Sequence, residues 1–362
     1  MVAARPTLTH CALPSRLSSM SEQQAKHLPQ RKQEHLEICL AGNVDGGVSS
    51  GAEQYQLVHV ALPEISLADV DLTTVFLGKR LAAPLLISSM TGGTPRAAAL
   101  NRRLARAAQS LGIAMGLGSF RAAIENPALA ATYQVREEAP DILLFANLGA
   151  VQLNYGYTAD QCRRAVETVG ADALMLHLNP LQEALQPEGE TSFAGLLTRI
   201  AELCRTLPVP VVVKEVGHGI SGQVARALRD AGVAAIDVAG AGGTSWSDVE
   251  AARDASVAAV AEPFHRWGIP TFDALVDVAA AVPDLPIIAS GGIRDGVDAA
   301  KALALGASLV GCGRPWLCAA AASPETLHAA IYTMIQQLRI ALFCCGAPDL
   351  EALGPHCIRT RS

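Results

Sequence analysis

The chain has 362 residues, of which 50% are hydrophobic, 4% aromatic and 17% charged, with a formal net charge of −6 at pH 7. Half-apolar composition without a long charge run argues against disorder, and no uncharged stretch is apolar throughout the roughly 20 residues of a membrane span. The acidic balance excludes nucleic acid as a general partner, although a local basic cluster can still bind a small anion.

Residues 1–83 are predicted to precede the main fold. Residues 1–30 show no dependable helical or β period, and we interpret them as an N-terminal extension and a candidate for disorder. Met20 followed by Ser-Glu-Gln-Gln is a plausible native start, so we expect the first 19 residues to be an extension or a misassigned beginning. Residues 31–83 are predicted to form an arm with a possible strand at Gln54–Leu62.

From Pro84 onward, short apolar runs end in Gly-, Ser- or Asn-rich corners and are followed by Ala/Leu-rich helical stretches. Their starts are mostly about 20 to 40 residues apart, the length of a strand plus a crossover helix. The predicted strands are Pro84–Ser89, Gly112–Gly116, Ile142–Asn147, Ala173–Asn179, Pro210–Glu215, Ala234–Ala239, Pro286–Ser290 and Ala307–Gly311. Eight such units predict an α/β protein with a (β/α)8 TIM barrel over residues 84–343. A doubly wound sheet is the alternative.

Two further features complete this outline. The interval after the sixth strand is long, which predicts an insertion of about 25 residues that covers a ligand at the barrel mouth. The apolar period of Ser323–Phe343 predicts a C-terminal helix, and residues 344–362 form a tail.

Polar and glycine-rich corners follow nearly all of the predicted strands, at the end where barrel enzymes place their sites. The corners after strands six, seven and eight read GGT, SGG and GCGR. Glycines let backbone N–H groups approach an anion, and a following helix N-terminus adds its dipole, so these corners favour a phosphate cradle. Ordinary strand–helix turns are the alternative.

Several single residues admit two interpretations. Lys214 ends a Val-rich strand and needs an anionic partner, either Glu215 or an electron-rich cofactor ring. The segment containing His177, Gln182 and Glu183 suits ligand recognition and a hard metal such as Mg²⁺, or else is a satisfied polar turn. Taken alone, residues 31–35 look like the first turn of a solvated helix. Arg121 looks like a surface arginine. Trp246 is either a lid residue or a core anchor.

Together these motifs resemble one family, the type 2, FMN-dependent isopentenyl-diphosphate isomerases. The matching segments occur in order: RKQEHLEI at Arg31, ISSMTGG at Ile87, GLGSFRAA at Gly116, ANLGA at Ala146, HLNPLQE at His177, VVVKEVGHGIS at Val211, GAGGTSW at Gly240, ASGGIRDG at Ala289 and GASLVGCGRP at Gly306. HLNPLQE and GGTSW are specific to the family, whereas SGGIR and the last glycine corner are shared by many flavin barrels. The resemblance covers residues 31–316.

The resemblance implies a role for each matching residue. The residues expected to bind FMN are Ser89, Met90, Thr91, Ser119, Asn147, Lys214, Thr244, Gly291, Gly292, Gly313 and Arg314. Those expected to bind the substrate, with its diphosphate, are Arg31, Lys32, Ser119, Phe120, Arg121 and Gln182, so the arm contributes to the substrate site. Glu183 matches the Mg²⁺ carboxylate. Gln182, His177, Glu250 and Trp246 are the expected catalytic and supporting groups. Gly313, where the family often has Ala, is a departure at the last phosphate contact.

The implied reaction converts isopentenyl diphosphate to dimethylallyl diphosphate by a 1,3-allylic proton shift, in isoprenoid biosynthesis. No His–Asp or Cys–Glu pair is obvious at the rim, so the resemblance points to reduced FMN as the acid/base, with NADPH needed only to reduce it. An FMN-dependent 2-hydroxy-acid oxidase is the main alternative, but the sixth corner, AGAGGTSW, has neither its His base nor its Arg clamp. An IMP-dehydrogenase-like enzyme would need a cysteine between strands six and seven, where there is none. A non-catalytic flavin-binding barrel leaves HLNPLQE and RKQEH without a purpose.

The nine cysteines form no CxxC pair, so neither a disulfide framework nor a zinc site is predicted, and a reducing cytoplasm fits best. Members of the family associate as tetramers or octamers, so we expect a homo-oligomer that binds no nucleic acid and no membrane.

Overall fold

The computed structural model describes residues 22–42 and 44–361. Eight parallel strands close into a barrel in the order β10-β11-β4-β5-β6-β7-β8-β9. They are β4 (Leu85–Ile87), β5 (Ala114–Gly116), β6 (Leu144–Gly149), β7 (Ala173–His177), β8 (Val211–Lys214), β9 (Ala235–Asp237), β10 (Ile287–Ser290) and β11 (Leu309–Cys312). Each lies within or beside a predicted run, and the predicted TIM barrel is confirmed.

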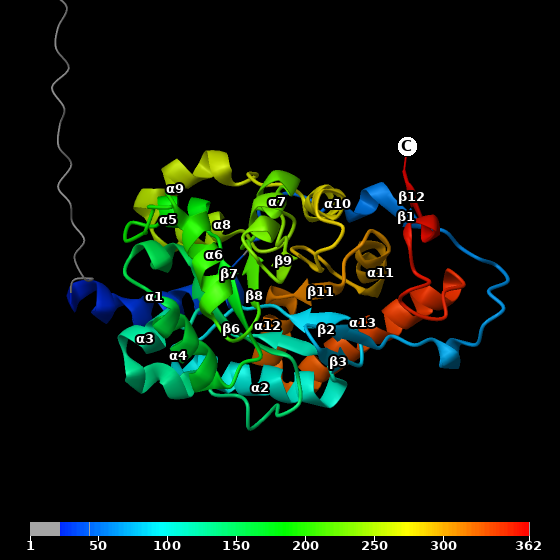
Figure 1. The fold of residues 1–362 in the computed structure, drawn as a ribbon, viewed down its shortest axis with the longest axis horizontal. Helices are drawn as coiled ribbons and strands as arrows, with labels where there is room; N and C mark the ends of the chain where they lie inside the picture. The colour runs from blue at the N-terminus through cyan, green and yellow to red at the C-terminus, as the bar shows by residue number, and fades with distance from the viewer. Residues whose placement is uncertain (1–21, 43, 362) are drawn as a thin grey trace, which may run out of the picture.

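Helices surround the strands (Figure 1). They are α2 (Pro95–Leu111), α3 (Arg121–Glu125), α4 (Ala159–Val169), α5 (Pro180–Leu185), α6 (Leu196–Thr206), α7 (Gly222–Asp230), α8 (Trp246–Arg253), α9 (Ala255–Ala261), α10 (Thr271–Ala281), α11 (Gly296–Ala304), α12 (Arg314–Ala322) and α13 (Pro324–Cys344). Short 3₁₀ turns add Ala52–Gln54, Leu67–Asp69, Pro127–Thr132, Ala150–Asn154, Glu262–Phe264 and Pro355–Cys357. The predicted insertion after β9 consists of α8, α9 and the turn at Glu262–Phe264.

Local sequence explains where these helices begin and end. Thr94 caps α2 by accepting from the Ala97 amide, and Gly112 ends the helix in the left-handed region at φ 64°. Thr158 and Gln161 form a capping box at the start of α4. These signals set the ends of α2 and α4, the helices that follow β4 and β6.

Two apolar layers hold the barrel together. The interior is filled by a cluster that includes Leu86, Phe145, Met175, Val212 and Ile288, each fully buried. A larger cluster fills the space between the strands and the outer helices. Strands buried on both faces explain the nearly continuous Val, Ile, Leu and Ala runs in the sequence.

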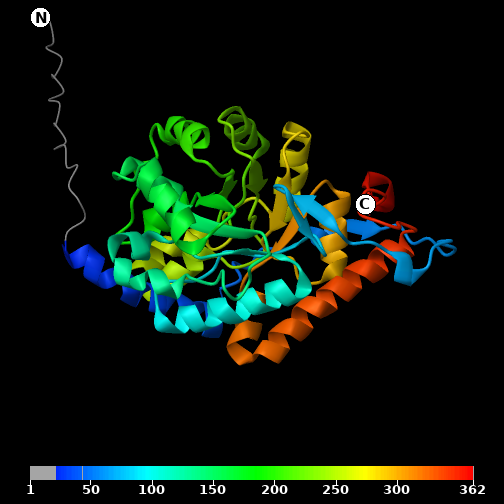
Figure 2. The same cartoon turned by 60° about the horizontal axis from the view of Figure 1, so that its bottom comes forward.

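Segments outside the barrel close its ends. Helix α1 (Glu22–Ala41) packs against α3, α8 and α12, which all follow carboxyl ends of strands. Strand β1 (Tyr55–Leu57) lies in the predicted Gln54–Leu62 run and pairs with β12 (Ile358–Thr360). This pair lies at the opposite end of the molecule from α1 (Figure 1). Strand β2 (Thr74–Phe76) pairs with β3 (Lys79–Leu81). Helix α13 runs along the outside below the barrel in Figure 2.

The N-terminal prediction changes in one respect. Helix α1 begins at Glu22, so the expected boundary at residues 30 and 31 falls inside a helix. Residues 1–19 and the proposed start at Met20 lie outside the described residues. The division of the chain into an extension, arm, barrel and tail stays a prediction. Within residues 22–42 and 44–361, no helix is long and apolar enough to cross a membrane.

Candidate active site

A ring of eight residues closes the top of the barrel interior. Side chains on a strand alternate between its faces, so the residue two positions beyond each interior apolar residue points inward as well. These residues, which we call the mouth layer, are Ser88, Gly116, Asn147, His177, Lys214, Asp237, Ser290 and Gly311. Asn147 Oδ1 lies 2.9 Å from His177 Nδ1, and Ser290 Oγ donates to Asp237 Oδ1 at 2.6 Å. The apolar core therefore ends in a floor of polar and glycine residues.

Above one side of this floor is a cavity of about 430 Å³ formed by the corners after β9, β10 and β11. Its lining includes Gly242, Gly243, Thr244, Gly291, Gly292, Gly313 and Arg314. Gly292 has φ +73°, and a Cβ on it would lie 2.2 Å from the Gly242 carbonyl oxygen. Backbone atoms of the two corners thus meet where only glycine fits, and α12 begins at the same rim. The geometry is that of an anion cradle.

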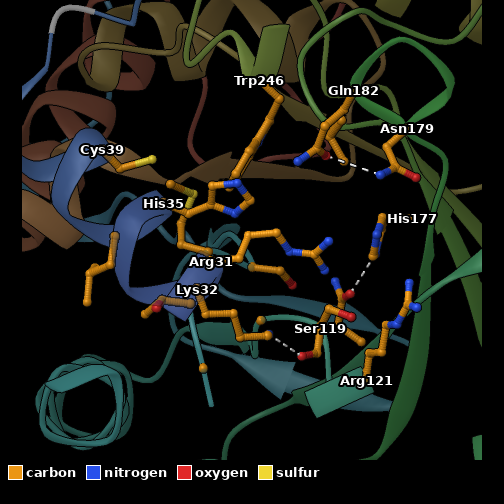
Figure 3. Close-up of a pocket in the computed structure, with 18 of the residues that line it drawn as sticks. Arg31, Lys32, His35, Cys39, Ser119, Arg121, His177, Asn179, Gln182 and Trp246 are labelled. Carbon is orange, nitrogen blue, oxygen red and sulfur yellow. Dashed lines mark hydrogen bonds between the residues drawn. The ribbon is translucent and has the colours of Figure 1, made fainter. Parts of the chain in front are cut away.

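A second cavity, of about 130 Å³, lies on the other side of the floor beneath α1. Both cavities are lined by Ser89, Met90, Lys214, Val216 and Trp246, so they are two parts of one site. Figure 3 shows Arg31, Lys32 and His35 of α1 facing Ser119, Arg121, His177 and Gln182 of the barrel corners. Residues 31–35 therefore lie over the mouth, not on a solvated helix.

Basic groups gather in this second cavity. The Lys32 amine donates to the Ser119 carbonyl at 2.7 Å and to the Tyr133 hydroxyl at 3.0 Å. Burial, followed by the charges of Arg31 and Arg121, lowers the pKa of Lys32 to about 7. Arg121 is buried and pairs with Glu190 and Glu125, both at 2.7 Å. Arg31, Lys32 and Arg121 all line this cavity, so three cationic groups can reach an anion bound there.

An amide–carboxylate network joins the corner after β7 to α8. Gln182 Nε2 donates to Glu250 Oε1 at 2.9 Å, and His35 Nε2 lies 3.0 Å from the same oxygen. Arg253 donates to the second Glu250 oxygen at 2.9 Å. Although burial raises the pKa of Glu250, His35, Gln182 and Arg253 together hold it below its usual value. Glu250 is thus a fixed carboxylate that orients Gln182.

Glu183 follows Gln182 on helix α5 and has hydrogen-bond partners of its own. Its oxygens accept from Asn179 Nδ2 at 2.9 Å and from the Glu190 amide at 2.7 Å. Burial raises the pKa of Glu183. The neighbouring Asn179 Oδ1 is buried and has no hydrogen-bond partner.

The mouth layer has its own electrostatics. Burial, followed by the Lys214 charge, lowers the pKa of His177 to about 3, so this imidazole is neutral. Burial also lowers the pKa of Lys214, which the charges of Asp237 and Glu215 oppose in that order. Lys214 Nζ donates to the Glu215 carbonyl at 2.5 Å. Asp237 as a counter-charge is a residue that the sequence interpretation missed.

All the residues expected at the site except Phe120 and Glu250 line one of the two cavities. The Phe120 ring is buried, with its centroid 4.9 Å from that of the Tyr133 ring, so it packs in the core, and its expected substrate contact stays a prediction. Glu250 lies behind Gln182 and His35, which line the cavity and contact its carboxylate. The Arg314 guanidinium, expected at the phosphate, donates to the Cys39 and Gly42 carbonyls and to Asp45. Its side chain therefore fastens the arm to the start of α12, at the rim of the cradle that Arg314 also lines.

The residues present fit a flavin mononucleotide. The cradle accepts a phosphate, Lys214 supplies a cation between the two cavities, and the buried Ser88 hydroxyl, which has no partner, lines the cradle. They also fit one Mg²⁺ that is shared with a ligand phosphate, because Glu183 and the unpartnered Asn179 oxygen are hard donors and Mg²⁺ commonly uses one or two carboxylates plus phosphates. No cluster of three His, Cys, Asp or Glu side chains within the described residues would hold a metal alone.

Comparisons with known proteins agree with this reading. The family described as FMN-dependent dehydrogenase matches residues 182–360, which supports FMN as the cofactor. Among solved structures, a mandelate oxidase variant with a monooxide FMN adduct superposes with a TM-score of 0.63, covering 94% of this chain and 98% of its own. A lactate oxidase of Pediococcus acidilactici superposes with a TM-score of 0.61, covering 92% and 91%. Their identities, 21% and 20%, show the fold alone.

Curated relatives are much more similar. An isopentenyl-diphosphate delta-isomerase of a Synechococcus species is 56% identical over 90% of this chain and 94% of its own length. The protein of that name from Stutzerimonas stutzeri is also 56% identical, over 90% and 95%. With this identity over nearly the whole chain, and with a flavin-type barrel whose two-part site the chain itself builds, the protein belongs to the isopentenyl-diphosphate delta-isomerase family of enzymes.

Proposed function

We propose that the protein moves the carbon–carbon double bond of isopentenyl diphosphate to give dimethylallyl diphosphate, using reduced FMN and Mg²⁺. One observation carries the proposal: a glycine cradle for one phosphate and a cation-lined chamber for a second, larger anion open onto each other at Lys214 and Trp246. A flavin-only barrel has no use for the second chamber.

The chamber's basic residues bind the diphosphate. Arg31, Lys32 and Arg121 come from α1 and from the corner after β5, so the ligand itself holds the arm against the barrel. A diphosphate carries about three negative charges, which need local cations and a metal in a protein of negative net charge. Its charge restores the ammonium form of Lys32, whose pKa burial has lowered to about 7.

Glu183 holds the Mg²⁺ and Asn179 assists it. When the metal binds, the Asn179 and Glu190 donors keep the Glu183 carboxylate in place, as supporting hydrogen bonds do for ligating carboxylates generally. Glu183 is then shared between the metal and the β7 corner, which fixes the diphosphate relative to Gln182.

Reduced FMN, which the glycine cradle and Lys214 would hold, would supply the acid/base chemistry for adding a proton at one end of the five-carbon unit and removing one at the other. Protonating an alkene creates cation-like character, which negative charge placed close to the reacting carbons stabilises when water is excluded. Gln182, oriented by Glu250, positions the five-carbon chain. Trp246 closes the chamber beside His35, whose ring centroid lies 5.3 Å away. Neutral His177, with Asn147, keeps the floor polar without adding charge.

Further aspects follow from the same proposal. NADPH reduces the FMN and is not consumed in each turnover. A homo-oligomer and a cytoplasmic location are proposed on the family resemblance, and the eight cysteines within the described residues are all free thiols, as a reducing compartment allows.

The test is to supply the purified, FMN-loaded protein with isopentenyl diphosphate, Mg²⁺ and a reductant, and in parallel with 2-hydroxy acids and oxygen. The expected result is dimethylallyl diphosphate and no oxidation of hydroxy acids. Oxidation of a hydroxy acid without isomerisation would replace this proposal by the oxidase alternative.

A further inference from the structure

The mouth layer contains one cation and one anion among its eight residues, and they are neighbours. Strands β8 and β9 pair in a register that sets Lys214 beside Asp237. Lys214 is 6% exposed and Asp237 is fully buried. Lys214 lines both cavities, whereas Asp237 lines neither. The cation therefore faces the ligand site, and the anion lies beside it in the floor.

One carboxylate oxygen of Asp237 can still accept a hydrogen bond. Its Oδ1 accepts from Ser290 Oγ at 2.6 Å and from the Ala239 amide at 3.2 Å. Its Oδ2 is buried and has no partner. A buried carboxylate oxygen left in this state is costly unless a nearby charge compensates for it. The mechanism proposed above gives Asp237 no task.

The other carboxylate near Lys214 is already engaged. Glu215 Oε2 accepts from the backbone amides of Val216 at 2.6 Å and Gly217 at 2.7 Å, so it is directed at its own loop. Lys214 uses the Glu215 carbonyl instead. Of the mouth-layer groups, His177 is neutral because burial and Lys214 lower its pKa to about 3. Burial raises the pKa of Asp237, and the Lys214 charge and the Ser290 hydrogen bond oppose that rise. The two buried groups therefore support each other's charged form, and Asp237 is the group whose charge most favours the ammonium form of Lys214.

We propose that Asp237, held in place by Ser290, is a positioning residue that keeps Lys214 protonated where the two cavities meet and thereby sets the reduction potential of the bound cofactor. A cation next to the flavin favours the electron-rich reduced form, and charge near the ring is one of the protein's means of tuning it. Without a counter-charge, a buried lysine tends to become neutral. The inference rests on the flavin part of the proposed function and not on the isomerisation.

The sign of the potential change makes the proposal testable. In Asp237→Asn the side chain keeps its shape and loses its charge. If Asp237 acts through Lys214, the lysine becomes neutral and the potential of bound FMN becomes more negative. We expect the equilibrium constant between oxidised and reduced FMN to shift by at least about tenfold toward the oxidised form, which corresponds to about 30 mV for a two-electron couple. If Asp237 acted only through its own field, removing its negative charge would raise the potential.

The measurement is an anaerobic redox titration of the holoprotein against a reference dye. Ser290→Ala, which removes one hydrogen bond from Asp237, is expected to shift the potential in the same direction by less, and it provides the test if Asp237→Asn does not fold. Asp160→Asn, at an exposed site, is the matched charge control and leaves the potential unchanged. An unchanged or raised potential in the buried variants overturns the inference. Protein without flavin absorbance would instead count against the proposed function.

Discussion

The side-chain amide of Gln182 donates to the carboxylate of Glu250 at 2.9 Å, although 68 positions separate the two residues in the chain. Gln182 belongs to α5, after β7, and Glu250 to α8, after β9. Arg253 holds the other carboxylate oxygen of Glu250. The direction of the Gln182 amide is therefore set by a second helix, as a residue that must orient a small apolar substrate requires.

Replacing Gln182 by Met removes this amide and keeps a side chain of similar length. We expect turnover to fall by about a hundredfold or more, since misplacing a substrate by about 1 Å can cost that much, while FMN stays bound. Product formation and flavin absorbance measure the two effects. Gln223→Met, at an exposed position of α7, is the matched control with normal turnover. Loss of FMN from the Gln182 variant would show that our role for Gln182 is wrong.

Lys32 gives the anion site a pH dependence. Its pKa of about 7 means that at pH 8 the amine is mostly neutral in the ligand-free protein. A bound diphosphate raises this pKa, so binding takes up about one proton at pH 8 and weakens as pH rises above 7. Calorimetry with inorganic pyrophosphate in buffers of different ionisation enthalpy measures the uptake. Equal proton uptake by the Lys32→Met variant would contradict the assignment.

The glycine cradle is tested by one pair of substitutions. Gly292 and Gly195 have nearly equal φ angles, +73° and +71°, but a Cβ on Gly195 meets nothing within 4 Å. Gly195→Ala should therefore cost only backbone strain, about 1 kcal/mol. Gly292→Ala also forces the β9 and β10 corners apart, and we expect FMN affinity to fall at least tenfold more than in the control. Fluorescence titration of apoprotein with FMN compares them; equal affinities would argue against the cradle.

His177 makes the fold sensitive to mild acid. Its folded-state pKa of about 3 lies below the ordinary value of 6.5, so the unfolded state gains a proton first as pH falls. Stability is lost from about pH 6.5 down to about pH 3, by about 2 kcal/mol between pH 7 and pH 5. His177→Gln should remove this part of the slope in urea unfolding, and His328→Gln, exposed on α13, should retain it. A slope unchanged in His177→Gln would mean that the imidazole is already charged.

The barrel could be predicted because its signals are local. Each strand is an apolar run of a few residues, and each ends in a glycine or polar corner that the chain needs in order to turn. Gly292 is an example: its positive φ and its contact with Gly242 leave no room for a side chain, so the glycine that this corner requires is visible in the sequence.

The features of the site that could not be predicted depend on how the barrel closes, because closure brings together residues that are far apart in the chain. Asp237 looks like an interruption of the run AIDVA, and only the β8–β9 register sets it beside Lys214. A charged residue within an apolar strand does signal a buried partner, and that signal could have found it. Arg314 was expected at a phosphate because it follows a glycine corner, but Asp45, 269 positions away, takes its guanidinium. The helical pattern of residues 31–35 did not indicate a site; the family resemblance predicted a substrate role for Arg31 and Lys32, and the packing of α1 places both residues at the mouth.

The most direct test of the central claim is the stoichiometry of reductant and product in an anaerobic assay with FMN-loaded protein, Mg²⁺ and isopentenyl diphosphate. The account predicts no dimethylallyl diphosphate with oxidised flavin, and many turnovers after a single reduction by NADPH, with no further NADPH consumed. Turnover by flavin-free or oxidised protein, or one NADPH oxidised for each product formed, would contradict it.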